Sequence, residues 1–294
     1  MVALSVGVPN FGPWCAGDWG ALLDVARAAE AAGVDRLVVT DHVVLGTHLD
    51  AYAWGRFPTA PDGPWLEPLT VLTAMAGVTR AVRLSTGILI APLRPAAVLA
   101  KTVATLDVLS GGRVDLGVGV GWQREEYDAL GLDFDDRGRL LDDTIAACRE
   151  LWTQLPASYS SPSITFDGIF CSPQPAQSRL PVWFAGTLND RNLRRIVELG
   201  DGWIPIMGAS LDDIRAGVER LRANMTRPFD VQAPLRLVRR DEGDVDMAET
   251  MQQVPELVGA GVTNVYVHLA TIAPSAKEAP AALERLVTAL GVAQ

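Results

Sequence analysis

The sequence predicts a closed (β/α)8 barrel, an α/β fold of the TIM-barrel type, formed by residues 1–294 as one domain. Short runs rich in β-branched residues alternate with helical patterns along the whole chain, which is typical of parallel strands joined by helical crossovers. Eight such units favour a closed barrel over an open doubly wound sheet of about five or six strands, which is the alternative fold. Glycine also precedes several strands at the same place, as in AAGVDRLVV and ELGDGWIPI, which indicates a repeated unit.

Eight segments have the composition of buried strands. Each is short, rich in apolar and β-branched residues, and bounded by residues that favour turns. In chain order they are 4–9 (LSVGVP), 36–40 (RLVVT), 83–91 (RLSTGILIA), 113–118 (RVDLGV), 181–185 (PVWFA), 202–206 (GWIPI), 235–239 (LRLVR) and 264–268 (NVYVH). In a barrel the active site lies at the C-terminal ends of the strands, so the residues that follow them are the candidates for function.

The segments between the strands carry helix start and stop signals. In residues 18–33, Asp18 is the expected N-cap, one face is apolar, and Gly33 ends the helix. A later helix is expected to begin after Ser210, which forms a capping box with Asp213. Both patterns place a helix where a βα unit requires one.

The charge and cysteine content argue against several classes of partner. With 25 basic and 35 acidic residues the net charge is −10, and phosphate backbones are bound by clustered Lys and Arg, so we expect no nucleic-acid partner. Cys15, Cys148 and Cys171 show no CxxC spacing, which argues against a disulfide framework and against a metal site. We find no basic leader and no long apolar span, so we expect a cytoplasmic protein without a membrane partner.

The second strand ends in TDHVV, which places Asp41 and His42 at the expected functional face. The chain has three histidines, and a histidine at this position can act as an acid, a base or a hydrogen-bond partner. A packed histidine beside a loop aspartate is an equally good interpretation of the same residues.

Residues 46–66 follow this strand as a loop without helical or strand periodicity. A long loop at this face of a barrel is usually a lid or a binding loop, and surface decoration is the alternative. Its rings, Tyr52, Trp54, Phe57 and Trp65, would give a lid an apolar underside that suits a flat or hydrophobic substrate. We therefore expect an insertion that covers a small-molecule substrate, with Trp54, Phe57 and Trp65 in contact with it.

Glycine is concentrated in and after the third and fourth strands. Gly87 interrupts a β-branched run, which indicates a bulge or a close approach of the backbone. In GVGVG, Gly117, Gly119 and Gly121 share one strand face and leave it flat and open, and tight helix–strand packing is the alternative. A dinucleotide-binding fingerprint is excluded, because the third glycine is at the wrong offset and the motif lies on the fourth strand.

The fifth strand is followed by small residues and by a helix whose first turn follows Asn189. The backbone amides of residues 185–188 would then meet an anionic group at the helix N-terminus. An ordinary turn capped by Asn189 explains the same residues without a ligand, and the pattern alone favours that interpretation.

Taken together, four strings resemble the bacterial luciferase-like family of flavin and deazaflavin enzymes, and in particular its coenzyme F420-dependent oxidoreductases. They are TDHVV, the segment TGILIAPLRPAAVLAKTVATLDVLSGGRVDLGVGVGWQREEYDALG, DDRGRLLDDTI and PVWFAGTLNDRNLRRIVELGDGWIP. The strings run in order across most of residues 1–210, and the last third of the chain is covered only by the expected fold.

The resemblance implies a cofactor site at the strand ends. A tricyclic ring would lie there, supported by a non-prolyl cis peptide between Gly87 and Ile88, and the glycines of the fourth strand would let this ring lie against the strand ends. The cofactor-binding residues implied in this way are Asp41, His42, Thr86, Gly87, Ile88, Gly119, Val120, Gly121, Trp122, Ala185, Gly186 and Thr187. The last three would meet the cofactor's phosphate through their amides. A homodimer is also expected from the resemblance.

By the same resemblance, the reaction is a hydride transfer between C5 of the deazaflavin and a small, apolar or aromatic organic substrate. His42 is the expected proton donor and Asp41 is expected to fix the tautomer of its ring. An ordering role for both residues is the alternative.

Three departures from the family pattern narrow the choice of cofactor and substrate. Relatives that oxidise a sugar phosphate carry an acid where this chain has Trp122, which argues against that substrate. FMN-using relatives carry a basic residue where this chain has Val120, which favours F420 over FMN. Many relatives read RHP where this chain has LRPA at 93–96, so the role of that histidine is absent. The alternatives to an F420-dependent oxidoreductase are an FMN-dependent monooxygenase, a non-catalytic flavin-binding barrel, and a barrel kept only as a structural partner in an oligomer.

Overall fold

The computed structural model describes residues 2–240 and 244–293. In this part of the chain, one nine-stranded sheet has the order β3-β2-β1-β11-β10-β9-β8-β5-β4, and an additional pairing of β3 with β5 closes it into a barrel. The strands are β1 (Ala3–Gly7), β2 (Arg36–Val39), β3 (Arg83–Thr86), β4 (Leu89–Ile90), β5 (Val114–Gly119), β8 (Val182–Ala185), β9 (Gly202–Ile204), β10 (Asp230–Pro234) and β11 (Asn264–His268). All their pairings are parallel, so the predicted (β/α)8 barrel is confirmed and the open doubly wound sheet is wrong.

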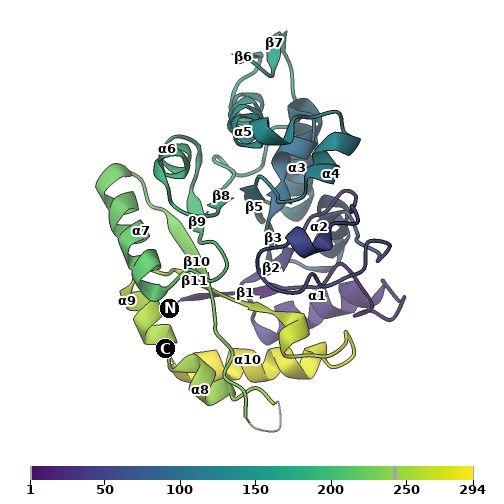
Figure 1. The fold of residues 1–294 in the computed structure, drawn as a ribbon, viewed down its shortest axis with the longest axis vertical. Coiled ribbons are helices and arrows are strands. Elements are labelled where there is room, and N and C mark those ends of the chain that lie inside the picture. The colour runs from purple at the N-terminus through teal and green to yellow at the C-terminus, as the bar shows by residue number, and fades with distance from the viewer. Residues whose placement is uncertain (1, 241–243, 294) are drawn as a thin grey trace.

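Helices surround the ring of strands and cover its outer face (Figure 1). They are α1 (Ala21–Ala32), α2 (Pro68–Val78), α3 (Ala96–Ser110), α4 (Arg124–Ala129), α5 (Arg137–Thr153), α6 (Asp190–Leu199), α7 (Leu211–Asn224), α8 (Met247–Met251), α9 (Val254–Gly259) and α10 (Ala279–Ala293). Short 3-10 turns lie at Leu49–Ala51, Ala91–Leu93, Phe134–Asp136 and Leu269–Thr271. Among the helices described, none combines the length and the apolar character that a membrane span needs.

The third predicted strand is divided in two by the Gly87–Ile88 peptide bond. This bond is cis, as the family resemblance implied, and β3 ends before it while β4 begins after it. Both parts pair with β5, so together they occupy one position in the barrel.

Two features of the fold differ from the prediction. The seventh strand is Asp230–Pro234 and not 235–239: Val231 and Ala233 are fully buried, and residues 232–234 pair with β11. The later segment only continues past the strand end, where the Leu235 amide donates to the Tyr266 carbonyl. An antiparallel hairpin, β6 (Ala157–Ser160) and β7 (Thr165–Ile169), was not predicted, and Figure 1 shows it projecting beyond α5.

The predicted helix caps have mixed outcomes. Ser210 and Asp213 form the expected capping box at the start of α7, and the Asn189 side chain caps α6. The Asp18 prediction is wrong, because Gly20 is the N-cap residue of α1. The Asp18 carboxylate accepts from the Gly20 amide instead, at 3.1 Å, and therefore closes the turn before the helix.

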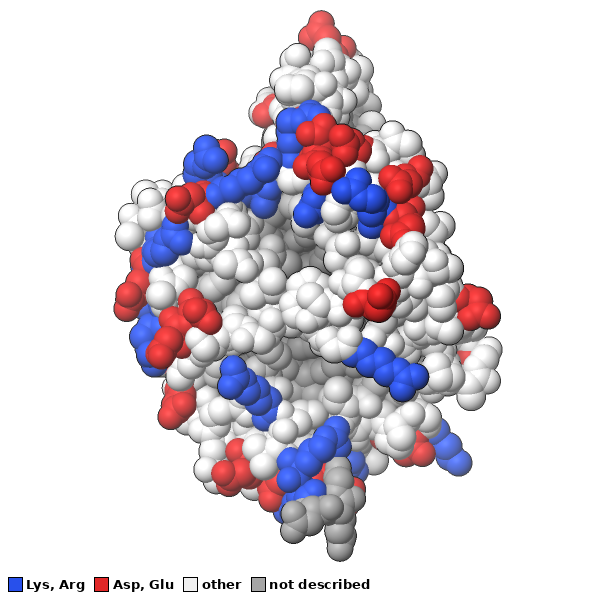
Figure 2. All heavy atoms as spheres, in the orientation of Figure 1, with Lys and Arg blue, Asp and Glu red and all other residues white. Residues whose placement is uncertain are grey.

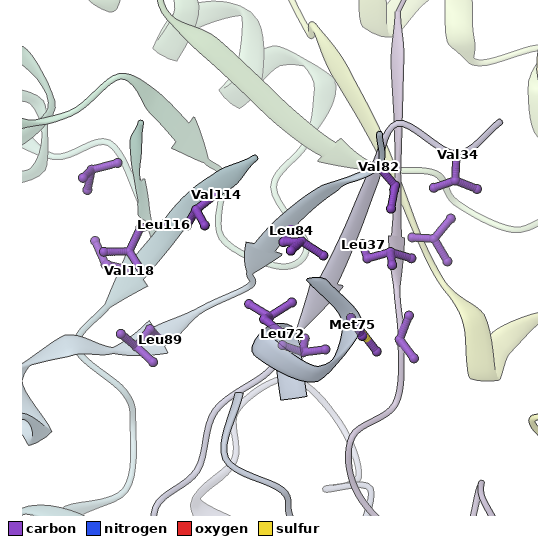
Figure 3. Close-up of a cluster of buried hydrophobic side chains, with 14 of the residues drawn as sticks. Val34, Leu37, Leu72, Met75, Val82, Leu84, Leu89, Val114, Leu116 and Val118 are labelled. Atoms are coloured by element: carbon purple, nitrogen blue, oxygen red, sulfur yellow. The ribbon is translucent and has the colours of Figure 1, made fainter. Parts of the chain in front are cut away.

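The core lies between the barrel wall and its helices. Figure 3 shows Leu72 and Met75 of α2 against Leu37 of β2 and Leu84 of β3, and all four side chains are almost completely buried. On β5, Val114, Leu116 and Val118 belong to the same core. Because side chains alternate along a strand, the residues between them, from Asp115 to Gly119, face the inside of the barrel.

A buried ion-pair network fills the barrel interior near the strand N-termini. Asp115 is 2% exposed and accepts from Arg36 Nε at 2.7 Å and from Arg83 Nε and Nη2, each at 2.6 Å. The Arg36 guanidinium also lies 4.5 Å from the ring centroid of Trp183. One carboxylate thus ties together β2, β3 and β5, and Arg36 extends the contact to β8.

Asp115→Asn is expected to lower the free energy of unfolding by about 3–5 kcal/mol, because the buried Arg36 and the partly buried Arg83 lose their counter-charge. Urea denaturation followed by circular dichroism measures the change. The matched control is Asp24→Asn, which removes an exposed ion pair with Arg27 and is expected to cost less than about 0.5 kcal/mol. Equal losses in the two variants would contradict the role of this network.

Candidate active site

The face shown in Figure 2 is hollowed on both sides of a ridge of uncharged atoms, and charged side chains gather around its rim. The loop 46–66 crosses the C-terminal ends of the strands. At one side the Gly46 amide donates to Gln123 Oε1 at 3.0 Å, and at the other the Tyr52 hydroxyl lies 4.0 Å from Met207 Sδ, after β9. The loop therefore spans the mouth of the barrel, as a lid would.

His42 is held by a carboxylate that sequence reasoning did not single out. His42 Nδ1 lies 3.0 Å from Glu126 Oε2, and the other oxygen of Glu126 accepts from the Val43 amide at 2.8 Å. Glu126 is fully buried on α4, and the His42 side chain is 8% exposed. Since an ionised carboxylate only accepts hydrogen bonds, the proton of the ring lies on Nδ1 and Nε2 is left for another partner. The adjacent Glu125 has the same chemistry, so only burial distinguishes the two.

Asp41 does not have the role expected of it. Its Oδ2 accepts from the Ile90 amide at 2.8 Å and from Arg94 Nη1 at 2.7 Å, and its Oδ1 accepts from Arg94 Nη2 at 3.0 Å. Within the described residues no hydrogen bond joins Asp41 to His42. The expectation that Asp41 fixes the tautomer of His42 is therefore wrong, and Asp41 instead anchors β4 and the segment after it.

Aromatic rings enclose His42 on several sides. Phe57, Trp65 and Trp122 lie edge-on to the imidazole, with centroid separations of 5.3, 4.6 and 5.9 Å. Phe57 is 7% exposed, so two of the three rings predicted to meet a substrate, Phe57 and Trp65, lie beside His42. The third, Trp54, is 38% exposed and contacts Tyr52 at 5.3 Å, farther out on the loop. Trp122 Nε1 and the adjacent Gln123 Nε2 are buried without a hydrogen-bond partner among the described residues.

The glycine row of β5 is not an open surface. A Cβ atom on Gly117 would lie 2.0 Å from the Thr86 carbonyl oxygen, and one on Gly119 would lie 2.8 Å from Ile88 Cδ1. One on Gly121, where φ is +69°, would lie 3.0 Å from Ile90 Cγ2. The face is covered by β3, β4 and the residues between them, so the expectation that it lies open for a flat ring is wrong. Glycine is required here for the close approach of two barrel strands.

The turn after β8 is only partly free to bind an anion. Gly186 has φ +112°, and its amide donates to the Ile204 carbonyl at 2.9 Å, so this amide is already satisfied. Asn189 caps α6 by accepting from the Asn192 amide at 2.9 Å. Thr187 is exposed and precedes this cap. Of the three predicted phosphate contacts, the Gly186 amide is therefore excluded, while Thr187 lies exposed.

A third group of polar side chains lies at the end of β11. His268 stacks on Phe11 with a centroid separation of 5.9 Å, and Phe11 stacks on Trp65 at 4.2 Å. Burial lowers the pKa of His268 to about 4, so its ring is neutral at physiological pH. Sequence reasoning placed His268 on a strand but assigned it no role, because a terminal strand residue carries no signal of what it faces.

Glu126→Gln is expected to move the proton of the neutral His42 ring from Nδ1 to Nε2. The new amide oxygen keeps the contact with the Val43 amide, so its NH2 group faces Nδ1 and requires an unprotonated nitrogen there. Proton–nitrogen correlation spectra of the histidine rings distinguish the tautomers. In the control Glu125→Gln, which removes the acceptor of the exposed His48, the His42 signals stay unchanged. A ring that keeps its proton on Nδ1 in Glu126→Gln would contradict this assignment.

Gly117→Ala is expected to destabilise the protein by about 1–3 kcal/mol, because the added methyl group meets the backbone of β3. Gly77→Ala is the control: it lies within α2, and no atom lies within 4 Å of its added Cβ. This control is expected to gain about 0.5–1 kcal/mol from the loss of glycine's conformational freedom. Thermal unfolding measures both, and a neutral Gly117→Ala would show that β3 and β5 can separate without cost.

Known proteins share both the sequence and the fold. An uncharacterised protein of Mycobacterium tuberculosis is 29% identical over 286 residues, which cover 90% of this chain and 92% of that protein. The FMNH(2)-dependent dimethylsulfone monooxygenase of Pseudomonas putida is 31% identical over 160 residues, covering 53% of this chain and 44% of that enzyme.

Two solved structures match the whole barrel. Monooxygenase RslO1 from Streptomyces bottropensis superposes with a TM-score of 0.80 at 17% identity, covering 98% of this chain and 99% of that one. An F420-dependent secondary alcohol dehydrogenase superposes with a TM-score of 0.73 at 16% identity, covering 99% of each chain. At these identities the likeness shows the fold alone. The sequence model of the luciferase-like monooxygenases, however, matches residues 7–280, and this chain therefore belongs to the luciferase-like monooxygenase family.

Proposed function

We propose that this protein is an F420-dependent oxidoreductase that transfers a hydride between the deazaflavin and a small, apolar or aromatic organic substrate. The observation that carries the proposal is the buried His42–Glu126 pair within the aromatic enclosure at the strand ends. Such a pair can hold a proton at a defined atom beside a substrate from which water is excluded.

The residues of the mouth fit a bound cofactor of this kind. Buried donors without partners call for a ligand or a water, and Trp122 Nε1 and Gln123 Nε2 are two such donors at the end of β5. They would hold the polar edge of the ring, and Thr187 would meet a phosphate group. F420, when bound, supplies a hydride donor or acceptor at C5 of its deazaflavin ring. Val120 offers no positive charge to the phosphate of FMN, which supports F420 over FMN.

The side chains of this protein supply the proton and the geometry. In the reduction of a carbonyl, the substrate carbon gains the hydride with its two electrons, and the oxygen gains a proton from Nε2 of the doubly protonated His42 ring, which leaves the ring neutral with its proton on Nδ1. The oxidation of an alcohol reverses both steps, and His42 Nε2 then accepts the proton. Glu126 keeps Nδ1 protonated throughout and so directs Nε2 to the substrate, while Phe57 and Trp65 exclude water.

A second candidate is an FMN-dependent monooxygenase. The likeness to the dimethylsulfone monooxygenase of Pseudomonas putida over about half of the chain favours it. In that case FMN would occupy the same mouth, and the reaction would consume O₂. We also propose that the chain forms a homodimer, which analytical ultracentrifugation tests.

Titration of the cofactor-free protein with F420 and, separately, with FMN is expected to show micromolar or tighter binding of F420 and at least tenfold weaker binding of FMN. The fluorescence of the eight tryptophans reports binding, because Trp122 borders the proposed site. The reverse preference would support the monooxygenase. Binding of neither cofactor would overturn both candidates and favour a barrel with another ligand.

His42→Gln is expected to slow hydride transfer about a hundredfold or more, because the substrate oxygen loses its proton donor. The dissociation constant of the cofactor is expected to change less than about threefold. Stopped-flow absorbance of the deazaflavin measures the rate with any carbonyl compound that a screen identifies. His48→Gln is the control, since the His48 side chain is 77% exposed. Full activity in His42→Gln would exclude His42 as the proton donor.

A further inference from the structure

Tyr266 and His268 extend from β11 across the end of β1. They are two residues apart on one strand, so both point to the inside of the barrel, and β1 places Ser5 and Gly7 opposite them. A Cβ atom on Gly7 would lie 2.1 Å from the Tyr266 hydroxyl oxygen and 3.0 Å from His268 Cδ2. The absence of a side chain at Gly7 is therefore what lets these two side chains lie across β1.

The polar atoms of this pair have no hydrogen-bond partner within residues 2–240 and 244–293. Neither the Tyr266 hydroxyl nor the ring nitrogens of His268 make a hydrogen bond with another residue in the part of the chain that the structure describes. Both side chains are half-buried, and their polar atoms are not among the fully enclosed ones. Deeper in the same barrel, by contrast, Arg36 donates to Asp115 and to Ser5, and Asp115 also accepts from Arg83. Unpaired polar groups in a protected mouth are the usual sign of a ligand contact.

Neither group carries a charge at neutral pH. Burial lowers the pKa of His268, and it raises the pKa of the Tyr266 hydroxyl, with the nearby Tyr52 hydroxyl adding to the second shift. No charged side chain contributes to either shift. A carboxylate or phosphate placed here would lose hydration, and neither of these two side chains offers it a positive charge.

The pair is separate from the His42–Glu126 pair but faces the same enclosure. The stacked rings of Phe11 and Trp65 lie between them, with His268 against Phe11 and His42 against Trp65. One small oxygen-bearing group cannot lie against both histidines, because two aromatic rings intervene. A flat ligand along this stack would reach both ends.

We propose that Tyr266 and His268 form a positioning subsite that binds a second, uncharged oxygen of the substrate, such as a hydroxyl, ether or carbonyl group remote from the reacting carbon. The Tyr266 hydroxyl donates to this oxygen, and the His268 ring accepts from a substrate hydroxyl or donates to a carbonyl. The substrate class is then an uncharged aromatic or alicyclic carbonyl compound, or the corresponding alcohol, with a further neutral oxygen. This inference rests on the proposed function only in its statement of which substrate group reacts. The subsite itself needs no cofactor.

Three probes of nearly the same size test the subsite: para-hydroxymethyl acetophenone, para-ethyl acetophenone and para-acetylbenzoate. Isothermal titration calorimetry measures their binding to the full chain, with and without the cofactor. The hydroxymethyl compound is expected to bind about three- to tenfold more tightly than the ethyl compound, as one added hydrogen bond allows. The anionic benzoate is expected to bind most weakly.

Tyr266→Phe and His268→Phe keep a flat ring at each position and remove only the polar atoms. Each is expected to reduce the preference for the hydroxymethyl compound, and the double variant is expected to abolish it. Binding of the ethyl compound and the melting temperature stay close to those of the wild type. Tyr159→Phe, in β6 of the projecting hairpin, is the matched control and keeps the preference.

The outcomes separate this inference from the proposed function. If the double variant retains the preference, or if the benzoate binds most tightly, the subsite is overturned whatever the cofactor. If neither F420 nor FMN binds but the preference is present and is lost in the double variant, the subsite stands and the proposed function fails. If a cofactor binds tightly but the protein shows no preference among the probes, the subsite is overturned and the proposed function stands.

Discussion

The Asp115 carboxylate, shared between Arg36 and Arg83, fixes the part of the barrel on which the site depends. Three strands contact this one group, which fixes their positions relative to one another along the barrel axis. Above it, the same inward face of β5 continues as Gly117 and Gly119, which lets β3 and β4 come close. The Ile90 amide then reaches Asp41, and His42 follows directly at the end of β2. A continuous series of contacts thus links the segment that carries the imidazole to a charge deeper in the barrel.

The barrel could be predicted from the sequence because its βα units repeat. A wrong assignment of one strand therefore does not change the predicted fold. The seventh strand is such a case: DVQAP has residues that are poor in strands, yet it forms one because β9 and β11 pair with it on both sides. The alternating LRLVR looks more like a strand but has no such neighbours. The β6–β7 hairpin was missed because two short strands outside the barrel repeat nothing else in the chain.

The candidate site was predictable only in part. His42 and the loop aromatics stand out by type and position, and the structure brings Phe57 and Trp65 to His42. Glu126 could not be distinguished from Glu125, since burial within a short helix depends on tertiary packing. The glycine row pointed correctly to a close approach, but a sequence does not say whether a ligand or a neighbouring strand makes it. Strand pairing decides whether a ligand or a strand lies there, and in this barrel Ile88 and Ile90 fill the space beside the glycines.

The rings that separate His42 from solvent belong largely to one segment, the loop 46–66. Phe57 and Trp65 lie on the loop 46–66, and Tyr52 on the same loop meets Met207 on the other side of the mouth. A movement of this loop would therefore expose the imidazole to water at the same time as it admitted a ligand. A ligand that fills the space restores the dry surroundings of His42, whereas one that holds the loop apart leaves the imidazole wet. Selectivity among ligands would then depend on how much water each bound compound leaves around His42.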